Sequence, residues 1–212
     1  TITKLKASYR EILMKYQENK NDYTLVSSPL ELQFENVDKL FSAFEVAMEN
    51  KAYQEVSKIV KAIDDLIGNL KLVIDEAPSI IMLGKNIIPK KITDITNISK
   101  KMEKDGYNLE YLNIPYNVTE SSKKITDIFQ RLNVLNIEDS IFELKTMLDY
   151  FDSIYNEFDK EKISRKIYND YLRTILIKIT KLTKINDTLL KRLDDIKYSY
   201  DLNDEDVEVV FQ

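Results

Sequence analysis

The sequence predicts an all-α fold, and the first observation behind this prediction is a shortage of turn-forming residues. The 212 residues include only three glycines and four prolines, where average usage would give roughly fifteen and ten. Because turns use both residues, few turns and long elements are expected, and long elements are helices rather than strands. The second observation is that apolar residues recur at helical spacing along most of the chain.

Composition also excludes several kinds of site. The chain contains no histidine and no cysteine, so it lacks the ligands of the usual zinc sites, a thiol nucleophile and the base of a Ser-His-Asp triad. Gly68, Gly84 and Gly106 stand too far apart for a glycine-rich phosphate loop. We therefore predict a protein that is not an enzyme, with no metal site and no cofactor. A net charge of −5 makes nucleic acid an unlikely partner, and no apolar run is long enough to span a membrane.

The first predicted helix covers residues 3–20. Its apolar residues recur every three or four positions: Leu5, Tyr9, Ile12, Leu13 and Tyr16. The polar run 19–22 is expected to end it.

The second predicted helix covers residues 28–49 and has a strong start signal. Ser28 can cap the free amides, Pro29 suits the first helical position and Glu31 would complete a capping box. A third helix follows a short break near Asn50 and continues to about Gly84. Pro78 lies inside this third helix and is expected to bend it or end it early.

The fourth predicted helix begins near Pro89 and ends at Gly106, which suits a glycine C-cap. Residues 107–114 form a connector. The fifth helix is expected from about Pro115 to Leu135.

The last predicted helix follows a heptad seam with alternating steps of three and four residues. The seam residues are Leu144, Met147, Phe151, Ile154, Phe158, Glu161, Arg165, Tyr168, Leu172, Ile175, Ile179, Leu182, Asn186, Leu189, Leu193 and Ile196. No glycine or proline interrupts it, so a helix about 80 Å long is expected. The polar positions Glu161 and Arg165 indicate a change of packing partner. Asn186 can fix the register of the seam within one chain or select a dimer.

An internal repeat of 88 residues is the third observation. Shifting the sequence by 88 positions superposes Val37 on Ile125, Leu40 on Ile128, Phe41 on Phe129, Val60 on Leu148, Ile63 on Phe151 and Leu70 on Phe158. The predicted architecture is an elongated array of antiparallel three-helix, spectrin-like units that share long helices. The first unit covers residues 1–87 and the second 88–160. Residues 161–200 continue the long helix into a third unit, and residues 201–212 form a connector and the start of its next helix.

The connector between the fourth and fifth helices resembles the bacterial septation ring formation regulator family, EzrA. In that family a helix ends in a Met…Gly-Tyr…Leu…Asn-Ile pattern and is preceded by two proline-marked helix ends. The residues at the positions of this pattern are Pro78, Pro89, Gly106, Tyr107, Leu109, Tyr111, Leu112 and Ile114. Tyr111 departs from the family, where histidine is common. The resemblance covers most of residues 30–170.

This resemblance implies a cytoplasmic rod tethered to the membrane by an N-terminal helix outside this sequence. Such proteins act on the cytoplasmic face of the membrane at the division septum. They bind the tubulin-like protein FtsZ and other division proteins, and they restrict ring assembly to midcell. Self-association of this chain stays open, because a long heptad seam serves a monomer or an antiparallel dimer equally well.

A second functional reading starts from the basic character of residues 160–197. These residues include eleven Lys or Arg and five acidic residues, and Lys178, Lys181, Lys184 and Lys191 can line one side of the helix. An anionic partner would make the chain a coiled-coil tether or arm of a chromosome or membrane-associated machine. The alternative is a solvated face beside the seam.

The acidic run at 201–206 resembles a calcium loop in composition only. Asp206 stands where such a loop needs glycine, and Gln212 stands where it needs glutamate. A turn capped by Asn203 is the preferred interpretation.

Overall fold

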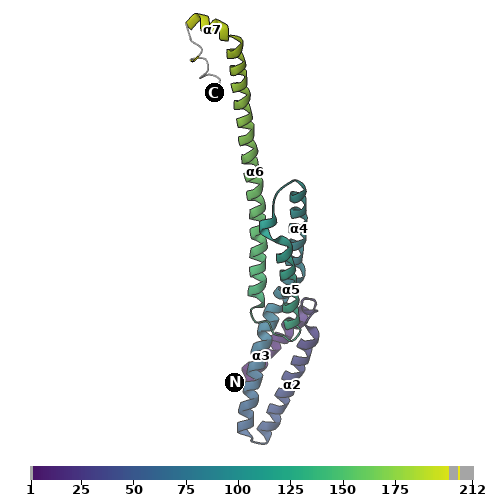
Figure 1. Ribbon diagram of the computed structural model, residues 1–212. Helices are drawn as coiled ribbons and strands as arrows, with labels where there is room; N and C mark the ends of the chain where they lie inside the picture. The colour runs from purple at the N-terminus through teal and green to yellow at the C-terminus, as the bar shows by residue number, and fades with distance from the viewer. Residues whose placement is uncertain (1, 201–204, 206–212) are drawn as a thin grey trace. The chain divides into compact units, whose positions relative to one another are not determined.

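The computed structural model describes residues 2–200 and residue 205, and the chain divides into two compact units, Thr1–Asn156 and Glu157–Gln212. The described part consists of helices and their connections, without a β-strand (Figure 1). The prediction of an all-α fold is therefore confirmed. The predicted turn at Asn203 and the residues 201–204 and 206–212 lie outside the described part.

The elements follow the predicted order. They are α1 (Ile2–Glu18), the 3₁₀ turn η1 (Lys20–Tyr23), α2 (Ser27–Glu49), α3 (Tyr53–Met82), the π-helical turn η2 (Leu83–Ile87), α4 (Ile88–Lys104), the 3₁₀ turn η3 (Glu110–Leu112), α5 (Ile114–Leu132), α6 (Ser140–Lys191) and α7 (Leu193–Tyr200).

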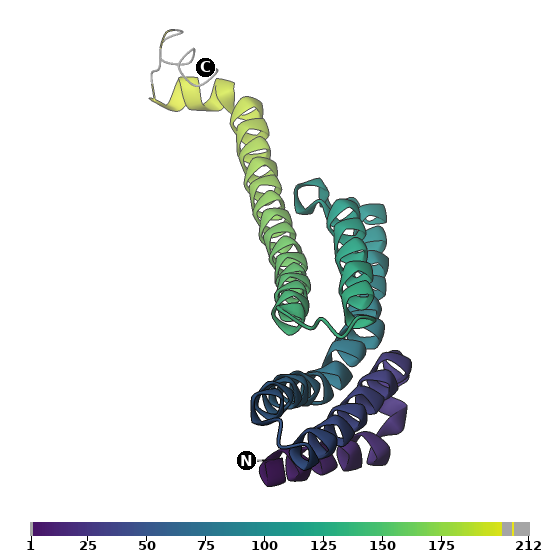
Figure 2. The ribbon, with the colours of Figure 1, turned by 90° about the horizontal axis from the view of Figure 1, so that it is seen from below.

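The compact unit 1–156 begins with a bundle in which α1 and α2 pack against α3 (Figure 2). An aromatic row fills its interior, because Tyr9, Tyr16 and Tyr23 stand seven residues apart and are all buried. The Phe34 ring of α2 lies 5.2 Å from the Tyr16 ring and 6.2 Å from the Tyr9 ring, measured between centroids. These tilted ring contacts add to the stabilisation from buried apolar area.

Pro78 does not end α3, contrary to one of the two outcomes that its position suggests. A proline has no N–H, so the carbonyl of Ile74, four residues earlier, loses its helical donor. The Tyr23 hydroxyl donates to that carbonyl at 2.9 Å in a buried position. The connector between α1 and α2, which contains η1 and is called the first connector below, thus provides a donor for the carbonyl that Pro78 leaves without one.

The break expected between Gly84 and Pro89 is also wrong, since η2 joins α3 directly to α4. The Ile88 N–H donates to the Leu83 carbonyl across five residues, which is the π-helical pattern. Gly84 is buried within this turn, and a Cβ at that position would lie 2.8 Å from Cζ of Phe129 in α5.

The same unit contains a second bundle, in which α4 and α5 lie side by side in both views (Figures 1 and 2). Lys91 of α4 forms an ion pair with Asp152 of α6, so the first turns of α6 belong to this bundle. Its buried apolar residues include Ile88, Ile95, Met102, Ile114, Ile125, Ile128, Leu132, Leu144, Met147, Phe151 and Ile154.

The predicted capping box of α2 is wrong. The helix starts at Ser27, its N-cap is Val26, and no side chain caps it. Glu31 instead accepts a hydrogen bond from the Tyr16 hydroxyl at 2.9 Å and pairs with Lys20 at 3.0 Å. The Glu31 carboxylate therefore binds Tyr16 of α1 and Lys20 of η1 instead of the backbone at the start of α2.

The fifth helix is shorter than expected and ends at Leu132 instead of Leu135. Leu135 adopts a positive φ of 58°, and the Asn136 N–H donates to the Arg131 carbonyl at 3.0 Å. This six-to-one bond closes the helix end in a Schellman-type motif.

The compact unit 157–212 contains the rest of α6 and the helix α7. Burial of the seam extends to Phe158, whereas Leu172, Ile179 and Leu182 are exposed. The helix ends at Lys191, so the seam does not continue unbroken to Ile196, whose side chain is not described. The Arg192 N–H donates to the carbonyl of Leu189 three residues back, and this tighter turn separates α6 from α7.

Candidate interaction sites

The connector after α4 is built around Gly106. Its φ of 82° lies in the left-handed region, where glycine has no Cβ penalty. The Tyr107 N–H donates to the Met102 carbonyl at 3.0 Å and the Gly106 N–H donates to the Glu103 carbonyl at 2.9 Å. Both bonds of a Schellman motif are present, so Gly106 ends the helix as its position in the sequence predicts.

The rest of the connector is anchored by two buried residues, Leu109 and Ile114, while Tyr107 and Leu112 are half-buried. Tyr111 is 58% exposed. The Leu112 carbonyl accepts hydrogen bonds from the Tyr150 hydroxyl of α6 at 3.5 Å and from Asn117 Nδ2 of α5 at 3.3 Å.

The two proline positions of the family pattern lie away from this connector. Pro78 lines a hollow of about 490 Å³ together with Asn21, Asp22 and Thr24 of the first connector. Pro89 is half-buried at the start of α4, and its carbonyl accepts a hydrogen bond from Thr93. The residues of the family pattern therefore lie in separate parts of the chain: Pro78 in α3 and Pro89 in α4, and the remaining residues at the connector after α4.

The predicted basic face lies on α6, in the compact unit 157–212. Lys178, Lys181, Lys184 and Lys191 are all exposed, and Asn186 of the seam is exposed beside them. Large apolar side chains stand on the same stretch, among them Leu176 at 62% and Leu182 at 65% exposure. This stretch combines cationic and apolar groups on one exposed helix.

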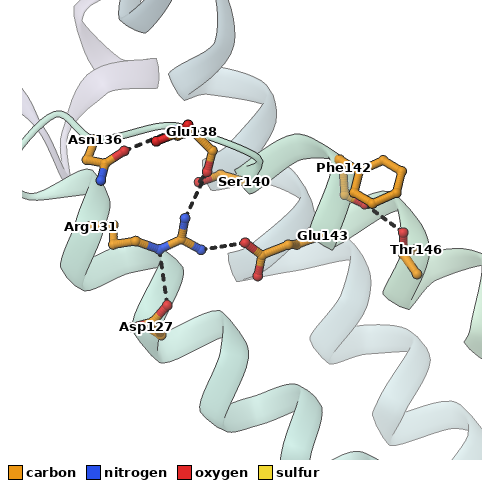
Figure 3. Close-up of polar contacts among 8 residues, drawn as sticks. All are labelled: Asp127, Arg131, Asn136, Glu138, Ser140, Phe142, Glu143 and Thr146. Atoms are coloured by element: carbon orange, nitrogen blue, oxygen red, sulfur yellow. Dashed lines mark hydrogen bonds and ion pairs between the residues drawn. The ribbon is translucent and has the colours of Figure 1, made fainter.

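Sequence reasoning missed a cluster around Arg131, shown in Figure 3. Arg131 at the end of α5 donates from Nε to Asp127 at 3.0 Å, from Nη1 to the Glu138 carbonyl at 2.8 Å and from Nη2 to Glu143 of α6 at 2.7 Å. Burial alone would lower the pKa of this guanidinium, but the two carboxylates raise it. Only the Asp127 contact, four residues away on one helix, is readable from the sequence.

A groove lies between α5 and α6, next to the Arg131 cluster. It encloses about 420 Å³ and its lining residues are Asn117, Glu120, Ser121, Lys124, Phe142, Glu143, Thr146, Met147 and Tyr150. The Phe142 side chain is 72% exposed, and in Figure 3 it points away from the Arg131 cluster.

The described residues contain no group of three or more acidic side chains placed to hold a metal ion. None of the helices in that part of the chain has the length and apolar character needed to cross a bilayer.

Comparison with known proteins gives one consistent result. The model of the septation ring formation regulator family, EzrA, matches residues 1–212. The EzrA protein of Staphylococcus epidermidis is 21% identical over 209 residues, which cover 99% of this chain and 37% of the relative. The EzrA protein of a Geobacillus species is 21% identical over 98% of this chain and 36% of its own length.

The Streptococcus gordonii EzrA protein is 20% identical over 95% of this chain and 35% of its own length. The chain thus spans little more than a third of these relatives. No solved structure is significantly similar to it. Because the family model matches the whole chain, including the Gly106 connector whose geometry is described above, the chain belongs to the septation ring formation regulator family, EzrA.

Proposed function

We propose that this chain is a non-enzymatic part of a rod that regulates bacterial cell division. The rod would lie on the cytoplasmic face of the cell membrane at the septum, tethered by a helix elsewhere in the protein. It would bind FtsZ and restrict ring assembly to midcell. The observation that carries this proposal is the family match over residues 1–212, since the relatives are named for septation ring formation.

The mechanism that we propose is geometric, with repeated units as spacers and their helix faces as binding surfaces. The proposed units are residues 1–87 and 88–160, followed by a third that begins at 161. Support comes from the helix starts: α2 and α5 begin at Ser27 and Ile114, and α3 and α6 begin at Tyr53 and Ser140. Both pairs are offset by 87 residues, close to the 88-residue repeat.

Co-sedimentation with polymerising FtsZ tests the binding part of this proposal. The 212-residue chain should pellet with FtsZ polymers in the presence of GTP and stay in the supernatant with GDP. A chain that remains soluble under both conditions, at protein concentrations of tens of micromolar, would show that this part of the protein does not bind FtsZ.

A second candidate function rests on the exposed lysines of α6. Residues 161–191 carry eight Lys or Arg and three acidic residues, and such an excess attracts anionic surfaces. Binding to anionic vesicles or to DNA should then weaken by about tenfold or more between 50 and 200 mM salt.

The matched variants place charge reversal on two helices. Replacing Lys178, Lys181 and Lys184 by Glu should abolish vesicle binding, whereas reversing the exposed Lys58 and Lys61 of α3 should leave it unchanged. Equal effects of the two changes, or no binding at low salt, would exclude this second candidate.

A further inference from the structure

We propose that α6 carries a contact surface for an anionic lipid bilayer on the side opposite its heptad seam. The residues of this surface follow one another at steps of three or four along about five helical turns, and all are exposed. They form the outer strip, which consists of Arg173, Ile177, Lys181, Lys184, Thr188 and Lys191. The proposal rests on the second candidate function above, and it selects a bilayer among the anionic partners.

The outer strip stays open whatever covers the seam. Successive residues of a helix are about 100° apart, so the strip lies on the opposite side of α6 from the seam residues Ile175, Ile179 and Leu182. Helices that pack on the seam, including those of the proposed third unit, would therefore leave the outer strip in solvent.

The outer strip has a surplus of positive charge that its surroundings do not cancel. Residues 171–191 include five Lys or Arg and a single acidic residue, Asp187, and Asp170 stands just before them. Ion pairs along the exposed side of α6 occur earlier, among residues 157–162. In the part of the chain that the structure describes, the four cations of the outer strip form no ion pair, so all four can face anionic headgroups.

Ile177 distinguishes a bilayer from the other anionic partners. Its side chain is 51% exposed and lies between Arg173 and Lys181 on the same face. Phosphates of duplex DNA can pair with the cations but leave the isoleucine in water, whereas a bilayer interface takes up both kinds of group. An interface with an acidic protein needs a cluster of buried apolar anchors, and the outer strip offers one large apolar residue.

Such a contact places this part of α6 parallel to the membrane surface. The apolar stems of the lysines would lie along the interface with their ammonium groups at the lipid phosphates, and Ile177 would enter the headgroup region. In the rod proposed above, the outer strip would be a membrane contact separate from the tether.

Tryptophan fluorescence tests which side of α6 meets the lipid. The chain contains no tryptophan, so an introduced tryptophan reports only on its own surroundings. Ile177→Trp lies on the outer strip, and Leu182→Trp lies at an exposed seam position as the matched variant. Each 212-residue variant is mixed with vesicles of phosphatidylcholine and phosphatidylglycerol that contain brominated lipid. The emission of Ile177→Trp should shift to shorter wavelength and be quenched, and Leu182→Trp should keep its unbound spectrum.

Sedimentation with the same vesicles, without brominated lipid, measures the contribution of charge. Lys184→Gln removes a cation from the outer strip and should weaken binding about fivefold. Lys178→Gln removes an exposed cation about 120° away around the same helix, and should weaken binding less than about twofold. The chain should not sediment with phosphatidylcholine alone, and its net charge of −5 means that binding to anionic vesicles requires a local basic surface.

Three results would each overturn the bilayer proposal. They are quenching of Leu182→Trp as strong as that of Ile177→Trp, equal losses from Lys184→Gln and Lys178→Gln, and no binding to anionic vesicles at low salt. Binding to duplex DNA without binding to vesicles would leave the second candidate function standing, whereas binding to neither would exclude both. Circular dichroism of each variant checks that its helices are intact, and FtsZ co-sedimentation tests the first proposal independently.

Discussion

At the scale of single residues, the tyrosines of the first bundle join packing to hydrogen bonding. Each hydroxyl reaches a different acceptor: Tyr9 donates to the Phe34 carbonyl, Tyr16 to Glu31 and Tyr23 to the Ile74 carbonyl. Burial is the largest cause of the raised pKa of all three phenols, and the Glu31 carboxylate contributes for Tyr16.

These shifts predict a loss of stability in alkali. The pKa of Tyr16 is raised to about 12, so the fold favours the neutral phenol. Its contribution is complete below about pH 10, the unfolded pKa, and is lost as pH rises through the folded value. Urea midpoints should therefore fall between pH 9 and 11.5, and Tyr16→Phe should reduce the slope. A midpoint independent of pH in this range would contradict the prediction.

Gly84 and Gly68 give a matched pair of helical glycines. Alanine at Gly68 meets nothing within 4 Å, whereas alanine at Gly84 meets the Phe129 ring. Both changes gain helix propensity, about 0.5–1 kcal/mol at a regular position, but only Gly84→Ala forces the ring to move. We expect Gly84→Ala to be less stable than Gly68→Ala by about 1–3 kcal/mol, measured by urea unfolding. Equal stabilities would indicate that Phe129 yields freely.

At the scale of elements, the ends of the helices decide where bundles begin. Gly106 uses its positive φ without strain, but the exposed Lys51 adopts φ 57° after α2 with the same pair of closing bonds. A side chain in this region costs about 1 kcal/mol relative to glycine.

The two helix ends therefore predict opposite effects. Lys51→Gly should stabilise the chain by about 1 kcal/mol, and Gly106→Ala should destabilise it by a similar amount. Thermal and urea unfolding of the two variants measure both values. A loss of stability in Lys51→Gly would show that its side chain contributes more than the strain that its backbone carries.

The Arg131 cluster predicts that a conservative replacement fails. Lysine cannot reach three acceptors in three directions, so Arg131→Lys should lose about 1–2 kcal/mol of unfolding free energy. A double-mutant cycle with Glu143→Gln separates the contact between the helices from the bond to the Glu138 carbonyl. A loss of unfolding free energy smaller than a few tenths of a kcal/mol would show that the exposed contacts of Arg131 contribute little.

Much of the fold at this scale is predictable from the sequence, because helical periodicity and the Gly106 stop are local signals. The predicted capping box at Ser28 is wrong because Tyr16 and Lys20, which are distant in sequence, bind the Glu31 carboxylate. The predicted break after Gly84 is wrong because the π-helical bond from the Ile88 N–H to the Leu83 carbonyl joins α3 to α4. Pro78 does not end α3 because the Tyr23 hydroxyl donates to the carbonyl that the proline leaves without its helical donor. The groove between α5 and α6 could not be predicted from the sequence, because it depends on which residues of the two helices face each other.

At the scale of the whole molecule, the heptad seam has two environments. Its residues from Leu144 to Phe158 are buried, and those from Tyr168 to Leu189 are mostly exposed. Tertiary packing supplies most of the stability of a helix, so the two parts of α6 should differ in local stability although their patterns are alike.

Hydrogen exchange measures this difference. In the 212-residue chain, amides of residues 144–156 should exchange with protection close to that of global unfolding, and amides of 170–188 should exchange at least a hundredfold faster. Equal protection along α6 would mean that another surface covers its exposed seam, in a second copy or elsewhere in the chain.

The π-helical turn at Leu83–Ile87 has a consequence for the evolution of the chain. Such a turn holds about one residue more than an α-helical turn, so it accommodates a one-residue insertion locally and leaves the following helix with the face that a continuous α-helix one residue shorter would give it. Deleting the exposed Lys85 should therefore let α3 and α4 join as one regular α-helix, with the buried face of α4 unchanged. When relatives are aligned, we expect a single-residue gap to be tolerated here without any shift in the buried positions of the following helix.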